Sequence, residues 1–363
     1  MCGRFALGVN LNELPSQFNN TVFSHEQHEE LTESSPGIYE GSIRGSEDDM
    51  RRVQFDFTRV NQWDGSYNIA PTNTAIVIYM VNTISNNNLD YKYVVESSKF
   101  GLVPFWAKPQ DPAATERDGK KGNEYSKELQ RTQARYFNCR KESLSSGQAV
   151  WNSCKKRTRC VVPIQGYFEW LKPKGSKLKI PNYVHSTKSP IIYLAGMYSH
   201  NTNYKSNYNV NDEYLSSFTI LTGPATREDL GDISWLHDRK PILLEPDTKA
   251  WYDWLNPDQE LSEKVLEEIL NTKTNKAYVD IEGYEVSKDV GNPSNKSKGL
   301  IEKVKKNKPI TSFFSANKKR IKTDDDEDDD DSHQHKKIKK EDANEYAKAT
   351  EHKDSKVKRE VEQ

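Results

Sequence analysis

The sequence is poor in cysteine and has no long apolar runs, and both shortages restrict what the chain can be. Four cysteines occur in 363 residues, at positions 2, 139, 154 and 160, and none forms a CxxC pair. A disulfide framework and a paired-cysteine zinc site are therefore not expected, and neither is a cofactor. No stretch approaches the ~20 consecutive apolar residues of a membrane span, and no secretory leader opens the chain. We expect a soluble, intracellular and monomeric protein without membrane contact.

Hydrophobic residues are also scarce, at 34% of the chain, with a mean hydropathy of −0.92. Part of the chain is therefore expected not to be globular. Residues 1–295 carry 34 Lys and Arg against 38 Asp and Glu, whereas residues 296–363 carry 19 against 16. The body thus has no general basic excess. If it binds nucleic acid, it must use a local basic cluster in a cleft.

Residues 296–363 form a charged tail that buries too little apolar surface to fold, and we expect it to be disordered. Its acidic run, 324–331, is flanked by the basic clusters 318–320 and 336–340. The acidic run has no assigned role. The charges are either a solvated surface or, in the basic clusters, nuclear import signals, so a nuclear location is expected and a cytoplasmic one stays open.

Residues 2–295 alternate between short β-branched or aromatic runs and a few helical segments, which predicts a single α+β domain. The expected strands are 75–81, 91–95, 158–163, 190–198, 217–222 and 278–286. The expected helices are 11–18, 123–136, 248–255 and 262–270. Two polar segments, about 21–52 and 107–123, interrupt the pattern and read as inserts with little to bury.

Cys2 follows the initiator Met directly, and removal of Met1 would leave a cysteine with a free α-amine. Such a 1,2-aminothiol has two adjacent nucleophiles that are both partly reactive near neutral pH. It can attack an amide or ester carbonyl, or condense with an aldehyde through an imine that the thiol closes to a thiazolidine. Position alone does not decide between these reactions and an accidental cysteine.

Several polar motifs accompany Cys2, and each by itself also has a purely structural explanation. Glu169 stands among aromatic neighbours in 166–170, an environment that raises the pKa of a carboxyl toward general-acid use. His237 precedes Asp238 and Arg239, and could equally be a loop histidine bonded to that aspartate. Asn138 could be a helix cap. The remaining motifs are Tyr67–Thr72, with Asn68 before a Pro turn, and Phe100–Trp106, which ends in two aromatics.

In this order, the motifs MCGRF, YNIAPT, GLVPFW, NCRKES, GYFEW and HDRKP resemble those of the SOS response-associated peptidase (SRAP) family over residues 1–295. The resemblance implies a fold of short, mostly antiparallel strands in a barrel-like core with flanking helices. It points in particular to eukaryotic, fungal-type members, which process abasic sites. It therefore implies an enzyme that cross-links itself to abasic sites in single-stranded DNA, with lyase-type and autoproteolytic activity.

The resemblance also implies residue roles. Cys2 is the nucleophile, Asn138 orients its amine, Glu169 is the acid and base, and His237 stabilises the adduct. The residues expected to hold DNA are Arg4, Asn68, Phe105, Trp106, Arg140 and Arg239. Phe105 stands where bacterial members often have Trp, and Cys139 stands where they have a small residue, with no role that we can assign.

Two alternatives remain open: an N-terminal-nucleophile cysteine amidohydrolase or peptidase, and a non-catalytic module that binds DNA ends. The tail adds a separate motif at 307–314, where Ile310, Phe313 and Phe314 resemble the segment that docks on the sliding clamp PCNA. One helical turn would bring these three side chains onto one face. The pair could instead pack on the body.

Overall fold

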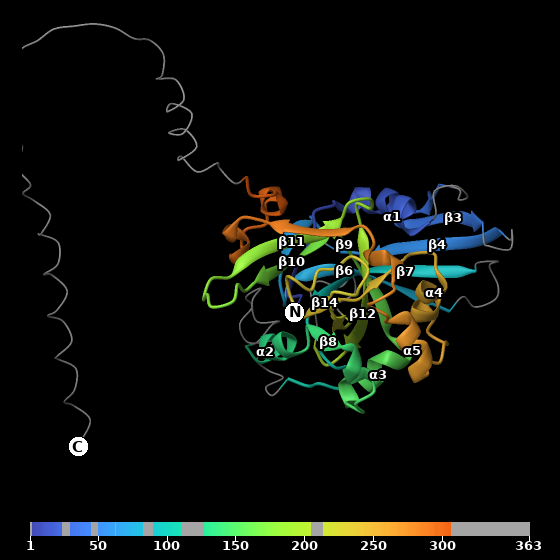
Figure 1. Ribbon diagram of the computed structural model, residues 1–363. Helices are drawn as coiled ribbons and strands as arrows, with labels where there is room; N and C mark the ends of the chain where they lie inside the picture. Colours follow the sequence, from blue (N-terminus) through green and yellow to red (C-terminus); the bar gives the residue numbers. More distant parts are fainter. Residues whose placement is uncertain are drawn as a thin grey trace, which may run out of the picture. The chain divides into compact units, whose positions relative to one another are not determined.

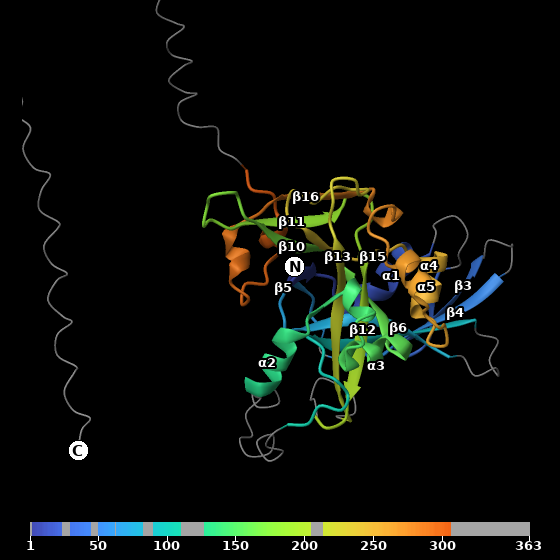
Figure 2. The same ribbon diagram turned by 60° about the horizontal axis from the view of Figure 1, so that its bottom comes forward.

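The computed structural model describes residues 2–23, 30–44, 50–61, 63–82, 90–109, 127–204 and 213–305 (Figures 1 and 2). All of them belong to a unit that spans residues 1–305. Most of the second insert and the whole clamp-like motif therefore lie outside the described residues. No helix in the described ranges is long and apolar enough to cross a membrane.

Among these residues, five strands form a small antiparallel sheet in the order β16-β11-β10-β1-β5. Its members are β1 (Arg4–Leu7), β5 (Ser66–Ile69), β10 (Gly166–Leu171), β11 (Ile180–Ser186) and β16 (Ile281–Glu285). The N-terminal strand β1 lies between β10 and β5, with Arg4 opposite Phe168 and Phe5 opposite Ile69. The first residues of the chain are thus held on both sides by distant segments.

A larger sheet runs in the order β14-β13-β12-β9-β6-β7-β4-β3-β2. The strands not yet bounded are β2 (Thr32–Ser35), β3 (Ile38–Arg44), β4 (Met50–Arg59), β6 (Thr74–Val81), β7 (Tyr91–Phe100), β8 (Asn138–Arg140), β9 (Arg159–Ile164), β12 (Ile192–Asn201), β13 (Leu215–Pro224), β14 (Arg239–Pro241) and β15 (Leu243–Leu244). β13 also pairs in parallel with β7 and with β8. The β13–β7 pairing makes the sheet partly ring-like, but β4, β3 and β2 continue outward, so it is not a closed barrel.

The core fills the space enclosed by these sheets because several strands are apolar on both faces. β6 reads TAIVIYMV with its six central residues buried. Aromatic side chains pack across strands, as in the stacked pair Phe55 and Tyr93, with ring centroids 4.7 Å apart. Such runs of branched and aromatic residues suit a pleated surface covered on both sides.

Helices lie at the edges of the sheets (Figures 1 and 2). They are α1 (Leu14–Val22), α2 (Lys127–Arg135), α3 (Ala149–Arg157), α4 (Lys249–Leu255) and α5 (Glu263–Ile269), with short 3₁₀ turns between elements. Thr248 and Ser262 accept backbone N–H bonds at the starts of α4 and α5, as N-caps do. The buried Arg159 donates to carbonyls at the C-terminal ends of α3 and α4, including Lys155 O (2.6 Å) and Trp254 O (2.6 Å). One guanidinium thereby donates hydrogen bonds to carbonyl groups in the last turns of two helices, which would otherwise lack partners.

The α+β class expected from sequence is confirmed. The polar segment 21–52, expected to be an insert, contains β2, β3 and the start of β4. β3 pairs with β4 through seven residue pairs, so the segment extends the edge of the large sheet. All four residues of β2 are exposed. Backbone pairing, more than burial, accounts for this extension.

Residues 287–304 form a C-terminal strap across the small sheet. The strap contains the 3₁₀ turns η6 (Lys288–Gly291) and η7 (Lys298–Ile301). Its Val290 and Leu300 are buried against Phe168 and Tyr183 of the sheet. The described structure therefore continues ten residues past Asn295, because the strap covers an apolar sheet face.

Candidate functional site

Cys2 lies just before β1, where the two sheets approach each other. Its side chain is 1% exposed, and its thiol lies 3.8 Å from the carbonyl of Arg4. Asn138, on β8 of the large sheet, donates from Nδ2 to the carbonyl oxygen of Cys2 (2.9 Å). This bond joins the N-terminal segment to the other sheet and fixes the backbone beside the thiol.

Glu169 reaches the same place from β10. It is only 7% exposed, and its Oε1 accepts the backbone N–H of Trp170 (3.1 Å). Burial raises the pKa of the Cys2 thiol to about 12, and the negative charge of Glu169 contributes to the rise, while the chain's α-amine opposes it. The thiol is therefore protonated at neutral pH in this arrangement.

Tyr167 is a member of the site for which the sequence predicted no role. It lies two residues before Glu169 on β10, so the two side chains share a face of the strand. It is 3% exposed, and burial raises its pKa, with the nearby Cys2 contributing to the rise. The alternation of side chains along the strand around Glu169 could have indicated from the sequence that Tyr167 lies on the same face.

β13 positions the basic side chains. Its Ile220 and Thr222 lie opposite Asn138 and Arg140 of β8, and its Pro224 lies opposite Arg239 of β14. Asn138, Arg140 and Arg239 therefore meet at one end of β13, although about 100 residues of sequence separate the two arginines. Arg140 is exposed.

Arg239 is held in place by a carboxylate and a carbonyl. It donates to both oxygens of Glu142 (3.2 and 2.8 Å) and to Thr222 O (2.8 Å). Burial disfavours the Glu142 carboxylate, but bonding to Arg239 outweighs this and lowers its pKa. His237 Nδ1 accepts the backbone N–H of Arg239 (3.0 Å) and lies 2.7 Å from Asp238 Oδ1. The His237 imidazole, just before β14, and the Arg239 guanidinium, on β14 itself, are thus both held in place.

Two buried polar atoms near Cys2 have no hydrogen-bond partner within the described ranges. They are Asn138 Oδ1 and Tyr167 OH. Thr222 Oγ1 and Arg239 Nε, on the paired strands β13 and β14, are also without a partner there. Buried polar groups are normally paired, and each exception calls for a physical explanation. Water or a polar ligand beside Cys2 would supply the missing partners.

Arg4 and Asn68 are not brought to this cluster. Arg4 donates from NH1 to Asn68 Oδ1 (3.1 Å) and to the carbonyl of Val290, and its guanidinium carbon lies 5.9 Å from the ring centroid of Trp170. Asn68 donates from Nδ2 to Val290 O (3.2 Å), Asn292 O (2.9 Å) and Asn295 O (2.9 Å). Both side chains hold the C-terminal strap, and their expected contact with DNA stays a prediction.

Phe105 and Trp106 form an exposed aromatic pair on the loop after β7. They are 56% and 41% exposed, with ring centroids 4.9 Å apart in an edge-to-face arrangement. Asn201 donates to Pro104 O (2.6 Å) and to Ala107 O (3.0 Å), which fixes the backbone on either side. Two large apolar rings are therefore held in solvent by a rigid loop.

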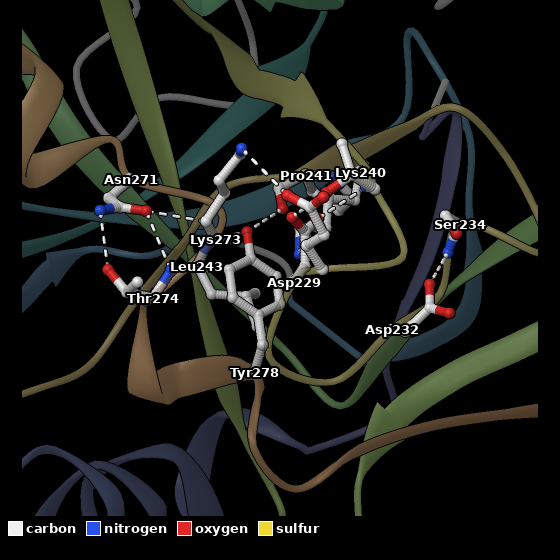
Figure 3. Close-up of polar contacts among 12 residues, drawn as sticks. Asp229, Asp232, Ser234, Lys240, Pro241, Leu243, Asn271, Lys273, Thr274 and Tyr278 are labelled. Atoms are coloured by element: carbon white, nitrogen blue, oxygen red, sulfur yellow. Dashed lines mark hydrogen bonds and ion pairs between the residues drawn. The ribbon is translucent and has the colours of Figure 1, made fainter.

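Lys240, the residue after Arg239, is buried and fixes β14 in place. The side chain of Lys240 is fully buried, and its Nζ lies 3.0 Å from Asp229 Oδ2 and 3.8 Å from the ring centroid of Tyr278 (Figure 3). Asp229 also accepts two bonds from Thr226, from the backbone N–H (2.8 Å) and from the hydroxyl (2.6 Å). Burial lowers the pKa of Lys240, and the bond to Asp229 opposes this shift.

Tyr278 also forms hydrogen bonds to the ends of two strands. Its hydroxyl donates to Pro241 O (2.7 Å) and accepts the N–H of Leu243 (3.1 Å) (Figure 3). The ends of β14 and β15 are therefore tied to one ring. In the sequence, Lys240 reads as one more exposed cation of the basic motif. Its partners lie 11 and 38 residues away, so sequence spacing gave no sign of its burial.

Cys139, for which the sequence predicts no role, is buried, and burial raises the pKa of its thiol, with Cys154 and Glu142 contributing. A protonated, inaccessible thiol behaves as a small apolar group. In the described ranges no three His, Cys, Asp or Glu side chains are grouped as metal ligands would be.

These features define a member of the SOS response associated peptidase (SRAP) family, to which the chain belongs: residues 1–293 match that family. The chain is 29% identical over 315 residues to the abasic site processing protein YMR114C of Saccharomyces cerevisiae, covering 83% of this chain and 68% of that one. It is 28% identical to the abasic site processing protein YoaM of Bacillus subtilis, covering 69% and 91%.

More distant similarity extends to vertebrates and to a solved structure. The abasic site processing protein HMCES of Gallus gallus is 25% identical over 57% of this chain and 58% of its own. A crystal structure of a protein from Bacteroides thetaiotaomicron matches with a TM-score of 0.52 and 16% identity, covering 84% of this chain and all of that one. At this identity the structural match supports the fold alone.

Proposed function

We propose that this protein processes abasic sites and does so by cross-linking itself, through Cys2, to abasic sites in single-stranded DNA. Its relatives from Saccharomyces, Bacillus and Gallus are abasic site processing proteins. The observation that carries the proposal is the burial of Cys2 beside Asn138 and Tyr167, whose Oδ1 and hydroxyl have no hydrogen-bond partner in the described part of the chain. A sugar with hydroxyl and phosphate oxygens offers the hydrogen bonds that these two atoms lack.

The proposed reaction begins after removal of Met1. The α-amine of Cys2 adds to the C1′ aldehyde of the ring-opened sugar, and loss of one water gives an imine. The thiol then adds to the imine carbon, its proton passes to nitrogen, and a C–S bond closes the thiazolidine. The thiol and the imine carbon belong to the same covalent adduct, so the thiol attacks intramolecularly at a high effective molarity. The thiazolidine is therefore expected to be long-lived.

In this proposal each neighbour has one role. Glu169 moves protons during sugar opening and imine formation, and its position beside a protonated thiol suits this task. Asn138 holds the Cys2 backbone so that the amine faces the sugar, and His237 stabilises the adduct and assists its elimination. Arg140 and Arg239 bind phosphate, which gives position without sequence preference.

Phe105 and Trp106 explain the proposed preference for unpaired DNA. Stacking of a base on an aromatic ring contributes about 1–3 kcal/mol and is insensitive to base identity. A base within an intact duplex has both faces covered by its neighbours. An exposed, rigid pair of rings therefore favours single-stranded or junction DNA next to the lesion.

The test is incubation with single-stranded DNA that contains an abasic site, followed by denaturing electrophoresis. The full chain should give a heat-stable shifted band, and Cys2→Ala should give none. Cys154→Ala, which removes another buried thiol, serves as the matched control and should cross-link normally. An extra alanine between Met1 and Cys2 keeps the thiol but blocks its amine, and should also fail.

Two outcomes would count against the proposal. A heat-stable adduct formed by Cys2→Ala would exclude the thiazolidine. Absence of an adduct together with release of free amine from peptide substrates would favour the amidohydrolase alternative.

The tail is proposed to bring this chemistry to replicating DNA in the nucleus. Ile310, Phe313 and Phe314 would dock on the sliding clamp PCNA and raise the local concentration of Cys2 at the fork. A peptide covering 305–322 should capture the clamp, and its Phe313→Ala/Phe314→Ala version should not. Equal capture by both peptides would leave the motif without this role.

A further inference from the structure

The loop between β10 and β11, residues 172–179, is a lysine-rich hairpin. Its four lysines are all exposed: Lys172, Lys174, Lys177 and Lys179. The sequence contains no Asp or Glu between Glu169 and Asp212. Within the described part of the chain, no ion pair joins any of the four to a carboxylate. The hairpin therefore carries a concentrated positive charge that the body does not neutralise.

This charge is placed on a well-defined support. β10 and β11 pair through six consecutive residue pairs, from Gly166 opposite His185 to Leu171 opposite Ile180. The loop itself turns at Gly175, whose φ of +74° suits glycine, and Ser176 N donates to Pro173 O (3.1 Å). Figures 1 and 2 show the hairpin extending from the body beside the C-terminal strap.

The hairpin is a direct continuation of the strand that carries Glu169. At about 3.3 Å per strand residue, Lys172 stands roughly 10 Å from Glu169 along β10. Lys174 and Lys177 lie farther out, at the tip. The lysines are thus too far from Glu169 to act on the lesion itself, but they are placed to meet the strand on one side of it.

The neighbouring strap also carries exposed lysines. Between 288 and 298 it exposes Lys288, Lys296 and Lys298, against the one acidic residue Asp289. The chain up to residue 295 has a slight excess of acidic residues, so this surface stands out in sign as well as in position. A row of exposed lysine side chains without acidic neighbours in sequence suits an extended polyanion.

We propose that the lysine hairpin is a phosphate-binding arm that holds the DNA backbone next to the abasic site. This inference rests on the proposed function, and it names the element that holds the flanking strand. Lysine binds phosphate as a point charge, without sequence preference. The arm would therefore add affinity and salt dependence, and leave the covalent step to the groups around Cys2.

The test compares the full chain with Lys172→Gln/Lys174→Gln/Lys177→Gln/Lys179→Gln. The control is Lys156→Gln/Arg157→Gln/Lys249→Gln/Lys264→Gln, which removes the same charge from exposed positions on α3, α4 and α5. Binding to undamaged single-stranded DNA is measured over a series of salt concentrations. The slope of log K against log salt should become shallower by about 0.7 for each phosphate that is no longer bound, or by up to about 2.8 in the hairpin variant. The control should keep the slope of the unmodified chain.

A second measurement locates the arm. Cross-linking rates are compared for oligonucleotides with the abasic site at either end or in the middle. The unmodified chain should lose rate when nucleotides are missing on one particular side, and the hairpin variant should be insensitive to that side. At saturating DNA both proteins should cross-link at the same rate, because Cys2 and Glu169 are unchanged.

Equal slopes for the hairpin variant and the control would overturn the inference, even if cross-linking proceeds normally. Tighter DNA binding by the hairpin variant would also overturn it. If the unmodified chain forms no cross-link but the slopes still differ as expected, the proposed function fails and the phosphate-binding arm stands.

Discussion

At the scale of single residues, burial keeps the Cys2 thiol protonated, and this has a bearing on the order of events. In the chain that still carries Met1, burial raises the pKa of this thiol to about 12. A protonated thiol is a weak nucleophile near neutral pH, whereas an imine carbon is a strong electrophile. The amine is therefore expected to react first and the thiol second. In the proposed reaction, the thiol would therefore act only after the sugar is attached.

Glu169→Gln should lower the pKa of the Cys2 thiol and, at the same time, slow the proton transfers of cross-linking. The Glu169 charge raises the pKa of Cys2, so its removal lowers that pKa and increases the thiolate fraction at any pH below it. Alkylation of Cys2, followed by mass spectrometry of the N-terminal peptide, should become faster in mildly alkaline buffer. Cross-linking to abasic DNA should become slower by about 10²–10⁴-fold, the usual contribution of a general acid or base.

Glu267→Gln on α5 is the matched control for this variant and should change neither rate. In both proteins alkylation should rise about tenfold per pH unit below the thiol pKa, because the thiolate is the nucleophile. Slower alkylation of Glu169→Gln would contradict the electrostatic coupling of the two groups.

At the scale of elements, β14 carries the arginine of the site on one residue and its anchor on the next. Arg239 faces Glu142, and Lys240 is buried against Asp229 and Tyr278. Adjacent strand residues point to opposite faces, so a three-residue strand can present a cation while being held from behind. The position of Arg239 therefore depends on a charge pair that never meets solvent.

Lys240→Met should destabilise the fold by about 3–5 kcal/mol, because it leaves the Asp229 carboxylate buried without its cation. The double variant Lys240→Met/Asp229→Asn removes both charges and should recover a large part of that stability. Thermal unfolding measures stability, and the salt dependence of DNA binding measures the position of Arg239. Lys249→Met, at an exposed position, should leave both unchanged. Equal destabilisation in the single and double variants would show that the loss does not come from an unpaired Asp229 charge.

Only part of the element positions was predicted from sequence: the six expected strands overlap strands of the structure, but β1, β10 and β11 of the small sheet and the helix α3 were not expected, and no pairing partner was. The expected strand at 75–81 matches β6, and the expected helix at 248–255 matches α4, because periodicity and caps are local signals. The parallel pairing of β13 with β7 depends on segments more than 100 residues apart, and no local pattern encodes it.

At the candidate site, too, some residues were predicted from the sequence and others were not. Cys2, Asn138 and Glu169 were predicted together and lie together. Tyr167 was missed because a buried tyrosine in a strand reads as core. Arg4 was assigned to DNA from its place in the first motif, and the structure holds its guanidinium against the C-terminal strap, whose carbonyls are invisible in the sequence pattern.

At the scale of the whole molecule, Asn68 joins the two ends of the body. Asn68→Ala would remove three bonds to the strap carbonyls and the acceptor of Arg4. We expect a loss of about 2–4 kcal/mol in stability, since those buried groups would lack partners. Hydrogen exchange should increase in residues 287–304 more than in the large sheet. Asn271→Ala, in a surface turn, should leave the exchange of the strap unchanged, and uniform exchange after Asn68→Ala would argue against a local role.

The hydrogen bonds between Arg4 and the C-terminal strap can form only late in the synthesis of the chain. Arg4 meets the carbonyls of Val290 and Gly291 only after the ribosome has added those residues, roughly 15–60 s after Cys2 at about 5–20 residues per second. Until then β1 lacks part of its native support, and the first residues of the nascent chain remain open to an aminopeptidase. Once the body closes, Cys2 is 1% exposed. We therefore expect any removal of Met1, which would create this α-amine, to occur on the growing chain, before folding is complete.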